Sequence, residues 1–359
     1  MRKSVTLSLQ ENIDKMRYKK KFAISLSNPS FNPKELKKIN LKDFNIQGNL
    51  SGHNKLISLA EKKLLKNWKI NNKKNQTLIT NGAKAGLYCI FKAIAGENKK
   101  NIAIINPNWP TYVDLIHLCN CKPLFFDTKF KDNYDINFQK LNKFLSTNKI
   151  ALLVLSSPNN PSGKVYNSQT INNLVKICNK NKCYLVIDES FSSHLFNKKL
   201  LNKKIQSNND FLIIVNSFSK NFHLQGLRLG IIHASKKLID LFTNIHIAVN
   251  GAPNTVSQYI VYSKKELLTA PDIKNKMLFV TNFLKSKNVD FYLPDGSFYL
   301  FPKIKNNRNF TKLANKNGLF FLGGKEFGSS YKGFYRFCFE KNEQELKKII
   351  KIMDKYEIY

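Results

Sequence analysis

Several chemically reactive or charged residues stand directly after apolar runs, and the first of them is a lysine. Lys220 follows the apolar run Leu212–Val215 and the two serines Ser217 and Ser219. A lysine whose pKa is lowered by its surroundings can attack a carbonyl group and form a Schiff base. A lysine that is simply exposed to solvent would not account for this neighbourhood. We therefore interpret Lys220 as a candidate nucleophile that works on a carbonyl group.

A carboxylate follows another apolar run. Asp188 comes directly after Tyr184–Ile187. A buried carboxylate costs free energy unless a cationic partner lies beside it. The position predicts a bound cationic group next to Asp188. The alternative is a helix N-cap, a position that favours aspartate.

Two further segments indicate sites for anions. Gly82-Ala83-Lys84 follows the run Thr77–Thr80 and opens a helical pattern, so free backbone amides and the positive end of a helix dipole would meet an anion there. As an alternative, Gly82 is a plain turn glycine. Arg336 lies between aromatic residues in an alternating segment, where an arginine is expensive unless it grips a carboxylate. A structural salt bridge is the alternative for Arg336.

Apolar, β-branched runs alternate with amphipathic stretches through the middle of the chain, and this pattern predicts an α/β fold. Such strands form a mostly parallel sheet with helices on both faces. Ligands bind at the carboxyl ends of the strands, where the residues above lie. The seven expected strands are Thr77–Thr80, Ile102–Asn106, Pro123–Phe126, Leu152–Leu155, Tyr184–Ile187, Leu212–Val215 and Gly230–His233. Expected helices include Ala83–Ile94, Tyr112–Leu118 and Ser168–Asn179.

The pattern changes after about residue 237, which predicts a second, smaller α+β domain. A helical stretch extends over Leu267–Lys287, strand signals follow at Phe298–Phe301 and Phe334–Phe339, and a charged helix covers Glu343–Lys355. We expect a large domain over residues 41–260 and a small domain over residues 261–359. Residues 1–40 are expected to contribute to the small domain.

Seven motifs in a fixed order give the chain a family resemblance. They are Asn81-Gly82-Ala83-Lys84, Asn108–Tyr112, Ser156–Gly163, Asp188–Phe191, Ser217–Lys220, Gly226–Gly230 and Phe334–Phe337. With them the chain resembles the fold-type I, class I and II aminotransferases, which depend on pyridoxal 5′-phosphate (PLP). It looks most like the branch of histidinol-phosphate aminotransferase and threonine-phosphate decarboxylase. The resemblance runs from about residue 28 to residue 339.

The resemblance implies a role for each motif residue. Lys220 and Asp188 would be catalytic: the lysine carries PLP and moves the substrate proton, and the aspartate pairs with the pyridine nitrogen. Arg336 would hold the substrate's α-carboxylate, together with Asn160, which also meets the cofactor's O3′. Trp109 would stack on the pyridine ring, unless Tyr112 does. The cofactor-binding set would be Gly82, Ala83, Lys84, Trp109, Asn160, Asp188, Ser217, Ser219, Lys220 and Arg228, with no metal.

Three departures from the family pattern narrow this expectation. Phe191 occupies the position where such aminotransferases usually have a tyrosine that binds O3′. Gln47 stands five residues before Gly52, where the family often has a tyrosine that reaches the neighbouring subunit. The remaining arginines, Arg2, Arg17 and Arg308, lie in no recognisable motif, so specificity for dicarboxylates is not supported.

The most direct interpretation is a PLP-dependent aminotransferase that takes an amino acid, with a 2-oxo acid as amino acceptor, through a Schiff base on Lys220. The alternative is a PLP-dependent decarboxylase, lyase or oxidase of the same fold, which Phe191 favours. A third hypothesis is a basic binding protein with a degenerate enzyme fold. The intact set of Lys220, Asp188 and Arg228 argues against this third hypothesis.

The net charge of +35 raises the question of an anionic partner. Only five of the 59 basic residues are arginine, whereas proteins that recognise nucleic acid favour arginine. We interpret the charge as a compositional bias and expect no specific nucleic-acid or membrane partner.

The six scattered cysteines fit no common zinc pattern. We expect a cytoplasmic homodimer with active sites shared between subunits.

Overall fold

The computed structural model describes residues 4–15, 21–24, 49–69, 75–96, 100–201, 205–206, 210–304 and 307–359. A seven-stranded sheet forms the centre of the large domain, in the order β3-β10-β9-β7-β6-β4-β5. All pairs are parallel except those of β10, which runs antiparallel to both β3 and β9. The strands are β3 (Asn75–Thr80), β4 (Asn101–Asn106), β5 (Lys122–Asp127), β6 (Ile150–Ser156), β7 (Tyr184–Asp188), β9 (Leu212–Ser217) and β10 (Gly230–Ser235). The seven predicted strands and the mostly parallel sheet are confirmed.

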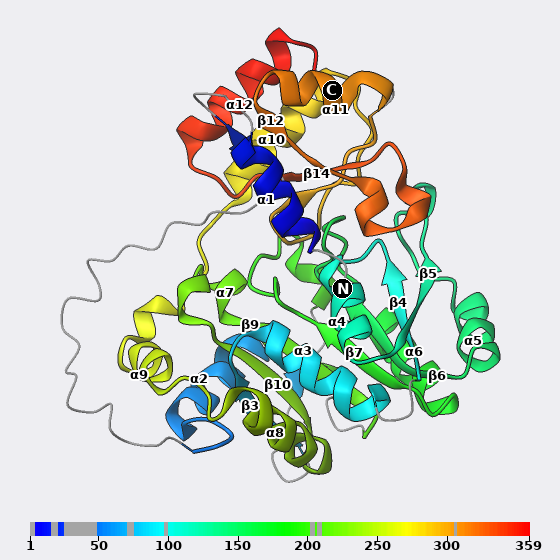
Figure 1. Cartoon of the computed structure of the whole chain (residues 1–359), viewed down its shortest axis with the longest axis vertical. Helices are drawn as coiled ribbons and strands as arrows, with labels where there is room; N and C mark the ends of the chain where they lie inside the picture. The colour runs from blue at the N-terminus through cyan, green and yellow to red at the C-terminus, as the bar shows by residue number, and fades with distance from the viewer. Residues whose placement is uncertain are drawn as a thin grey trace.

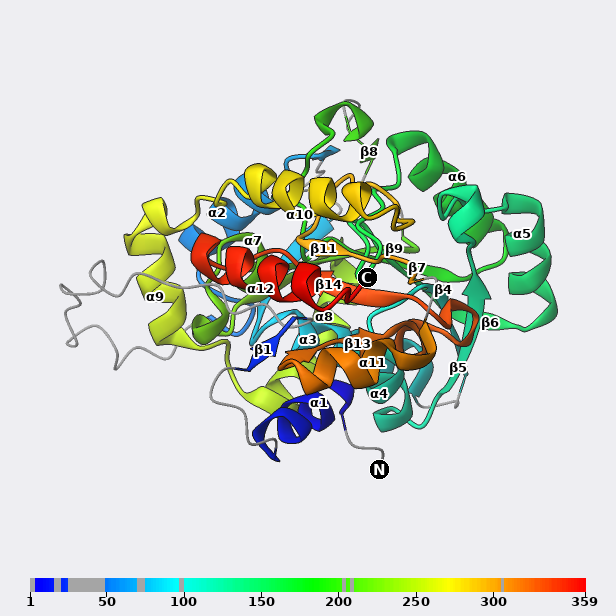
Figure 2. The ribbon, with the colours of Figure 1, turned by 90° about the horizontal axis from the view of Figure 1, so that it is seen from above.

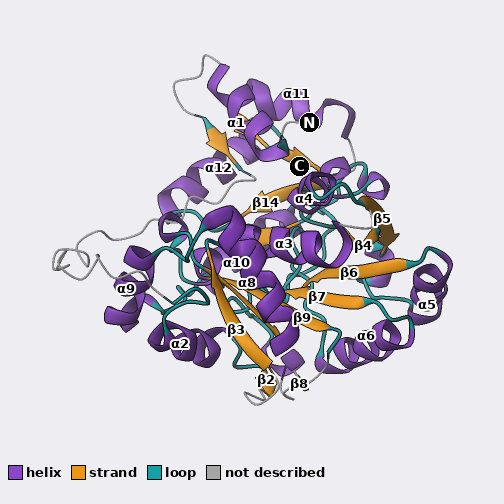
Figure 3. Cartoon of the chain, turned by 60° about the horizontal axis from the view of Figure 1, so that its bottom comes forward, coloured by secondary structure: helices purple, strands orange, loops and turns teal. Residues whose placement is uncertain are grey.

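Helices cover both faces of this sheet, as Figure 3 shows. One face packs against α2 (Asn54–Leu64), α5 (Phe138–Thr147), α6 (Ser168–Lys180) and α9 (Thr255–Ser263). The other face packs against α3 (Ala83–Phe91), α4 (Thr111–Leu118) and α8 (Lys236–Asn250). Neighbouring strand residues such as Leu153 and Val154 point into opposite cores. Each fully buried aliphatic side chain contributes roughly 1.5–3 kcal/mol, so apolar residues on both faces stabilise the strands.

A second layered unit lies above the carboxyl ends of the strands (Figure 1). Its three-stranded sheet has the order β11-β14-β13. The strands are β11 (Tyr299–Leu300), β13 (Leu322–Gly323) and β14 (Tyr335–Cys338), and the helices are α10 (Lys274–Ser286), α11 (Asn307–Lys316) and α12 (Glu343–Lys355). The aromatic side chains that the sequence places on alternate positions fill its core. In the described part of the chain, no helix is long and apolar enough to cross a membrane.

Two described N-terminal elements, α1 and β1, pack against this small domain. Strand β1 (Phe22–Ala23) pairs in parallel with β12 (Leu319–Phe320), and Ile24 is fully buried in the same core. Helix α1 (Val5–Lys15) places Val5 and Leu9 against an aromatic cluster that includes Phe301 and Phe334. Figure 2 shows α1 and β1 beside α11 and β13. Residues 25–48 lie outside the described residues, so the domain limit at residue 40 stays a prediction.

One predicted helix is shorter than the sequence pattern suggested. The stretch Leu267–Lys287 becomes helical only at α10, which begins at Lys274. Pro271 disfavours helical backbone in the residue before it and lacks an amide donor. The side chain of Asp272 then accepts the backbone amide of Lys274 at 2.9 Å. A short 3-10 turn, Lys265–Leu267, closes the preceding segment.

Candidate active site

A cavity of about 400 Å³ opens at the carboxyl ends of the central strands. Side chains from the large domain, from β11 and β14 of the small domain, and from the start of α1 line it. The structure therefore brings together residues that are up to 332 positions apart in the chain, from Ser4 to Arg336. The predicted site residues that line it are Ala83, Lys84, Trp109, Asn160, Asp188, Ser217, Ser219, Lys220, Arg228 and Arg336. Gly82 lies at the edge of this set, at the start of α3.

Lys220 is held on a short helix, α7 (Phe218–Asn221), directly after β9. The carbonyl oxygen of Lys220 accepts a hydrogen bond from Nε2 of His194 at 2.9 Å. The side chain of Asn221 donates to the carbonyl of Ser217 at 3.0 Å, which closes the turn. Burial lowers the pKa of the Lys220 amine, and the nearby Arg336 and Arg228 charges lower it further, against the opposing influence of Cys338 and Glu340. A lowered pKa makes more of the amine available as a nucleophile.

Asp188 ends β7 and is buried. Its Oδ2 accepts the hydroxyl of Tyr112 at 2.6 Å, and its Oδ1 accepts the backbone amide of Ser190 at 2.9 Å. Burial raises the pKa of this carboxyl, although both hydrogen bonds oppose the shift. No helix follows Asp188, since residues 190–193 form turns, so Asp188 is not a helix N-cap. A carboxylate held by these two neutral donors fits a cationic group in the cavity.

An anion cradle forms where α3 begins. Gly82 has a φ of +87°, and a Cβ there would lie 2.6 Å from Nη2 of Arg228. A Cβ on Gly230 would lie 2.4 Å from the backbone nitrogen of Ala83. Gly82 requires glycine because of its positive φ, and Gly230 because the backbone at the first turn of α3 lies so close to it. Nη1 of Arg228 also donates to Oγ of Ser219 at 3.5 Å. Helix amides, a guanidinium and a hydroxyl together suit a phosphate group.

Arg336 projects from β14 and is buried. Its Nη1 donates to Oδ1 of Asn160 at 3.0 Å. Its Cζ lies 4.4 Å from the ring centroid of Tyr299 and 5.0 Å from that of Phe327. The two rings and the amide fix the orientation of the guanidinium at the cavity, and its planar shape suits a carboxylate.

The structure adds residues that the sequence did not single out for the site. Tyr112 was considered only as an alternative ring-stacking residue, yet its hydroxyl binds Asp188. Tyr299 lines the cavity and stacks on Arg336. Ser4 lines the cavity from the start of α1. The spacing of Trp109 and Tyr112, one helical turn apart, is the only sequence signal among these, since the other two depend on how the small domain packs.

Phe191 packs edge-on against Phe298 and Tyr299, with ring centroids 4.9 and 5.7 Å away. The aromatic environment explains why a phenyl ring is stable there without a hydroxyl partner. Trp109 is half-buried at the cavity, and its ring meets Tyr112 edge-on at 5.4 Å. Arg2, Arg17 and Gln47 lie outside the described residues, as does the side chain of Arg308.

Known proteins that are similar to this chain are aminotransferases. The family model for aminotransferase class I and II matches residues 33–353. An aspartate aminotransferase from Thermotoga maritima is 27% identical over 235 residues, which cover 64% of this chain and 62% of that protein. One from Sulfurisphaera tokodaii is 25% identical over 305 residues, covering 79% and 75% of the two chains.

Solved structures show the same fold. The crystal structure of the Thermotoga maritima aspartate aminotransferase has a TM-score of 0.86 at 23% identity, covering 100% of this chain and 98% of that one. The aspartate aminotransferase from Thermus thermophilus with maleate has a TM-score of 0.85 at 17% identity, covering 99% and 97%. The fold and the cavity define a fold-type I enzyme with a cofactor site. The chain belongs to the class I and II aminotransferase family, and it is a PLP-dependent aminotransferase that uses amino acids and 2-oxo acids.

The residues present fit PLP. The buried carboxylate of Asp188 suits a protonated pyridine nitrogen, and the glycine-dependent cradle of Gly82 and Arg228 suits a phosphate. Lys220 lines the same cavity, with an amine of lowered pKa. Asp188 and the cradle would hold the two opposite ends of the flat cofactor, and Lys220 would meet its reactive carbon.

Proposed function

We propose that this aminotransferase prefers an amino donor with an anionic side chain, and that Lys84 binds this side chain. The ammonium of Lys84 lies 5.5 Å from the ring centroid of Trp109, and both residues line the cavity. Packing at the cavity wall lowers the pKa of Lys84, and the Arg228 charge lowers it further, against a smaller opposing influence of Asp114. Lys84 nevertheless remains exposed enough to meet a ligand.

Two cationic side chains would therefore bind the two anionic groups of such a substrate. Arg336 would take the α-carboxylate and Lys84 the side-chain anion, while the backbone amide of Lys84 stays part of the phosphate cradle. The expectation against dicarboxylate substrates rested on the absence of a suitable arginine, whereas Lys84 supplies a cation of another kind. The names of the relatives, aspartate aminotransferases, support a carboxylate as the side-chain anion.

A second candidate donor is an amino acid with a phosphate on its side chain. The resemblance to the histidinol-phosphate aminotransferase and threonine-phosphate decarboxylase branch implies it, and Phe191 in place of the usual tyrosine favours that branch. The ammonium of Lys84 would bind either anion as a point charge. Both candidates share the same requirement for a cation at this position.

The protein's own groups perform the proton transfers of the reaction. When bound, PLP supplies the carbonyl carbon that joins the amino group and the ring that accepts electrons from the substrate. Lys220 Nζ would remove the proton from the substrate Cα and deliver it on the cofactor side, as a general base and then a general acid. Asp188 would keep the pyridine nitrogen protonated, and the Tyr112 hydroxyl would hold this carboxylate in place.

We also propose that the enzyme acts as a homodimer. Asn254 begins α9, and its backbone amide donates to the side chain of Asn81 at 2.9 Å, next to the Gly82 cradle. Val249 and Val256 flank this segment and are 56% and 42% exposed. An apolar surface this close to the cradle suits a second copy of the chain. A cytoplasmic location stays a prediction.

The donor preference is tested with single-turnover reactions of the purified holoenzyme. Aspartate, a phosphorylated amino acid and alanine are compared in the wild type and in Lys84→Met, which keeps the apolar stem. We expect Lys84→Met to lower kcat/KM about 10- to 30-fold for the anionic donors, or about 1.4–2 kcal/mol, and to leave alanine nearly unchanged. An equal effect on all three donors would contradict the role of Lys84.

A further inference from the structure

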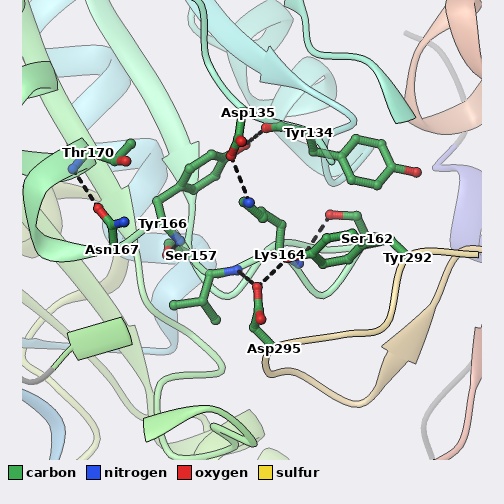
Figure 4. Close-up of polar contacts among 11 residues, drawn as sticks. Tyr134, Asp135, Ser157, Ser162, Lys164, Tyr166, Asn167, Thr170, Tyr292 and Asp295 are labelled. Atoms are coloured by element: carbon green, nitrogen blue, oxygen red, sulfur yellow. Dashed lines mark hydrogen bonds and ion pairs between the residues drawn. The ribbon is translucent and has the colours of Figure 1, made fainter. Parts of the chain in front are cut away.

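The turn that carries Asn160 is held by a loop of the small domain. We call residues 159–165 the Asn160 turn and residues 292–297 the small-domain loop. The carbonyl of Gly163 accepts the backbone amides of Asp295 and Gly296 at 3.0 and 3.1 Å. Oδ2 of Asp295 accepts the backbone amide of Val165 at 3.2 Å. Figure 4 shows Asp295 from the small-domain loop against the Asn160 turn.

The Asp295 carboxylate is itself fixed from a second direction. Its Oδ2 accepts the hydroxyl of Tyr292 at 2.5 Å. The ammonium of Lys164 lies 5.4 Å from the centre of the Tyr292 ring and 2.8 Å from Oδ1 of Asp135. The Asp135 side chain is 71% exposed, so this ion pair contributes little. The Asp295 carboxylate thus joins the two segments by a hydrogen bond, beside the weaker contact of the Lys164 ammonium with the Tyr292 ring.

The two segments approach each other too closely to slide. Gly163 has a φ of +74°, and a Cβ there would lie 2.4 Å from the Cβ of Pro294. A Cβ on Gly296 would lie 2.6 Å from the carbonyl oxygen of His194 and 2.9 Å from Cγ of Pro158. The segments therefore cannot move closer together, and their separation depends on the contacts that hold them.

Two of the three contacts that orient Arg336 originate at this junction; the third, with the Phe327 ring, does not. Asn160, on the turn, accepts Nη1 of Arg336 at 3.0 Å. The small-domain loop continues into β11, where the Tyr299 ring lies 4.4 Å from Cζ of Arg336. The distance between turn and loop therefore sets how the amide and the ring meet the guanidinium.

We propose that Asp295 is a positioning residue for the subsite that binds the substrate's α-carboxylate. Its carboxylate holds the small-domain loop at a fixed distance from the Asn160 turn, and so keeps Asn160 and Tyr299 in register on Arg336. Asp295 does not line the cavity. The inference rests on the proposed role of Arg336 and concerns a residue about 130 positions away from the turn that it holds.

The test compares Asp295→Ala and Asp295→Asn with Asp135→Ala, a matched control that removes a neighbouring carboxylate from the same network. KM and kcat for an amino acid and a 2-oxo acid are measured on the holoenzyme, together with the Kd of succinate, an unreactive carboxylate. Asp295→Ala should raise both KM and the succinate Kd by about tenfold, which corresponds to about 1.4 kcal/mol of carboxylate binding. Changes in kcat should stay within about twofold, and PLP retention should not change.

Further variants test whether the rise in KM follows the number of hydrogen bonds removed from Asp295. Asp295→Asn keeps one acceptor oxygen and should raise KM less than Asp295→Ala does. Tyr292→Phe removes one of the two side-chain bonds and should act in the same direction, which keeps the test valid if Asp295→Ala does not fold. Asp135→Ala should match the wild type. A purely structural role would lower the melting temperature of the Asp295 variants without changing KM, and this result would overturn the inference.

Arg336→Lys separates this inference from the proposed function. If Arg336→Lys leaves the succinate Kd unchanged, the proposed carboxylate subsite is wrong and the inference falls with it. If Arg336→Lys weakens succinate binding and Asp295→Ala behaves like Asp135→Ala, only the role of Asp295 is wrong. When both are right, Asp295→Ala should add less than its full factor in the Arg336→Lys background, because the two residues act on one subsite.

Discussion

Replacing Arg336 with methionine removes the guanidinium and keeps an unbranched stem between Tyr299 and Phe327. Arg336 is only 3% exposed, so its bond to a substrate carboxylate would form in a desolvated site. Truncating one partner of such a charge pair typically costs about 2–5 kcal/mol. At 1.4 kcal/mol per factor of ten, kcat/KM for amino acids should fall by about 30- to 4,000-fold.

The assay for Arg336→Met combines kinetics with a cofactor readout. PLP retention is measured by dialysis and absorbance, and kcat/KM with an amino acid and with an amine that lacks a carboxylate. The value of kcat/KM for the amine should fall little, because the amine makes no bond to Arg336. The Arg336 charge also lowers the pKa of the Lys220 amine, so its removal should raise that pKa and move the pH dependence of PLP capture by the apo-enzyme to higher pH. Arg336→Lys should recover only part of the rate, because an ammonium cannot form two parallel bonds.

A different pattern would refute this reasoning. If Arg336→Met sheds PLP and reacts normally once PLP is in excess, Arg336 holds the fold of the site rather than the substrate. If the amine and the amino acid lose equally, no carboxylate is bound at this position. In either case the structural salt bridge that the sequence left open would be the better interpretation.

Three further predictions concern the cofactor site and the core. Borohydride reduction of the holoenzyme should fix PLP on the peptide that contains Lys220, as mass spectrometry would show, and Lys220→Ala should abolish the label. Gly82→Ala places a Cβ 2.6 Å from Nη2 of Arg228 and should weaken PLP binding at least about tenfold, measured by fluorescence titration. Burial raises the pKa of Glu189, which accepts the indole N–H of Trp68, to about 8. The pKa of Glu189 is thus higher in the folded than in the unfolded protein. The free energy of unfolding should therefore fall as pH rises from about 5 to about 8, by at most about 5 kcal/mol. Glu189→Gln should flatten this part of the urea-denaturation profile.

The central sheet could be predicted from the sequence because its strands are buried on both faces. Continuous apolar runs such as Leu152–Leu155 have no other stable position in an α/β protein. The candidate site followed from the same rule, since Asp188 and Lys220 come directly after such strands. In each case the prediction depended on the residues of one short, continuous segment.

The features that could not be predicted depend on contacts between distant segments. The sequence assigned Lys84 to the phosphate cradle through its backbone, and nothing in it showed that the side chain lies beside Trp109. Tyr112 and Asp188 are 76 residues apart, and their hydrogen bond depends on how α4 packs on the sheet. The late start of α10 was predictable from Pro271, but the apolar spacing of the stretch outweighed that signal.

Because the antiparallel strand β10 pairs with β3, we expect the cofactor cradle to form late in folding. Gly230 is paired with Thr80 of β3 on one side and with Ser217 of β9 on the other. The chain segments that bear Gly82, Ser219 and Arg228 therefore meet only after β3 has paired with a strand about 150 residues further along the chain. Pairings across such long separations form slowly. Newly made chains should thus capture PLP only after the sheet has closed at this edge, and hydrogen exchange without PLP should be fastest in β3 among the central strands.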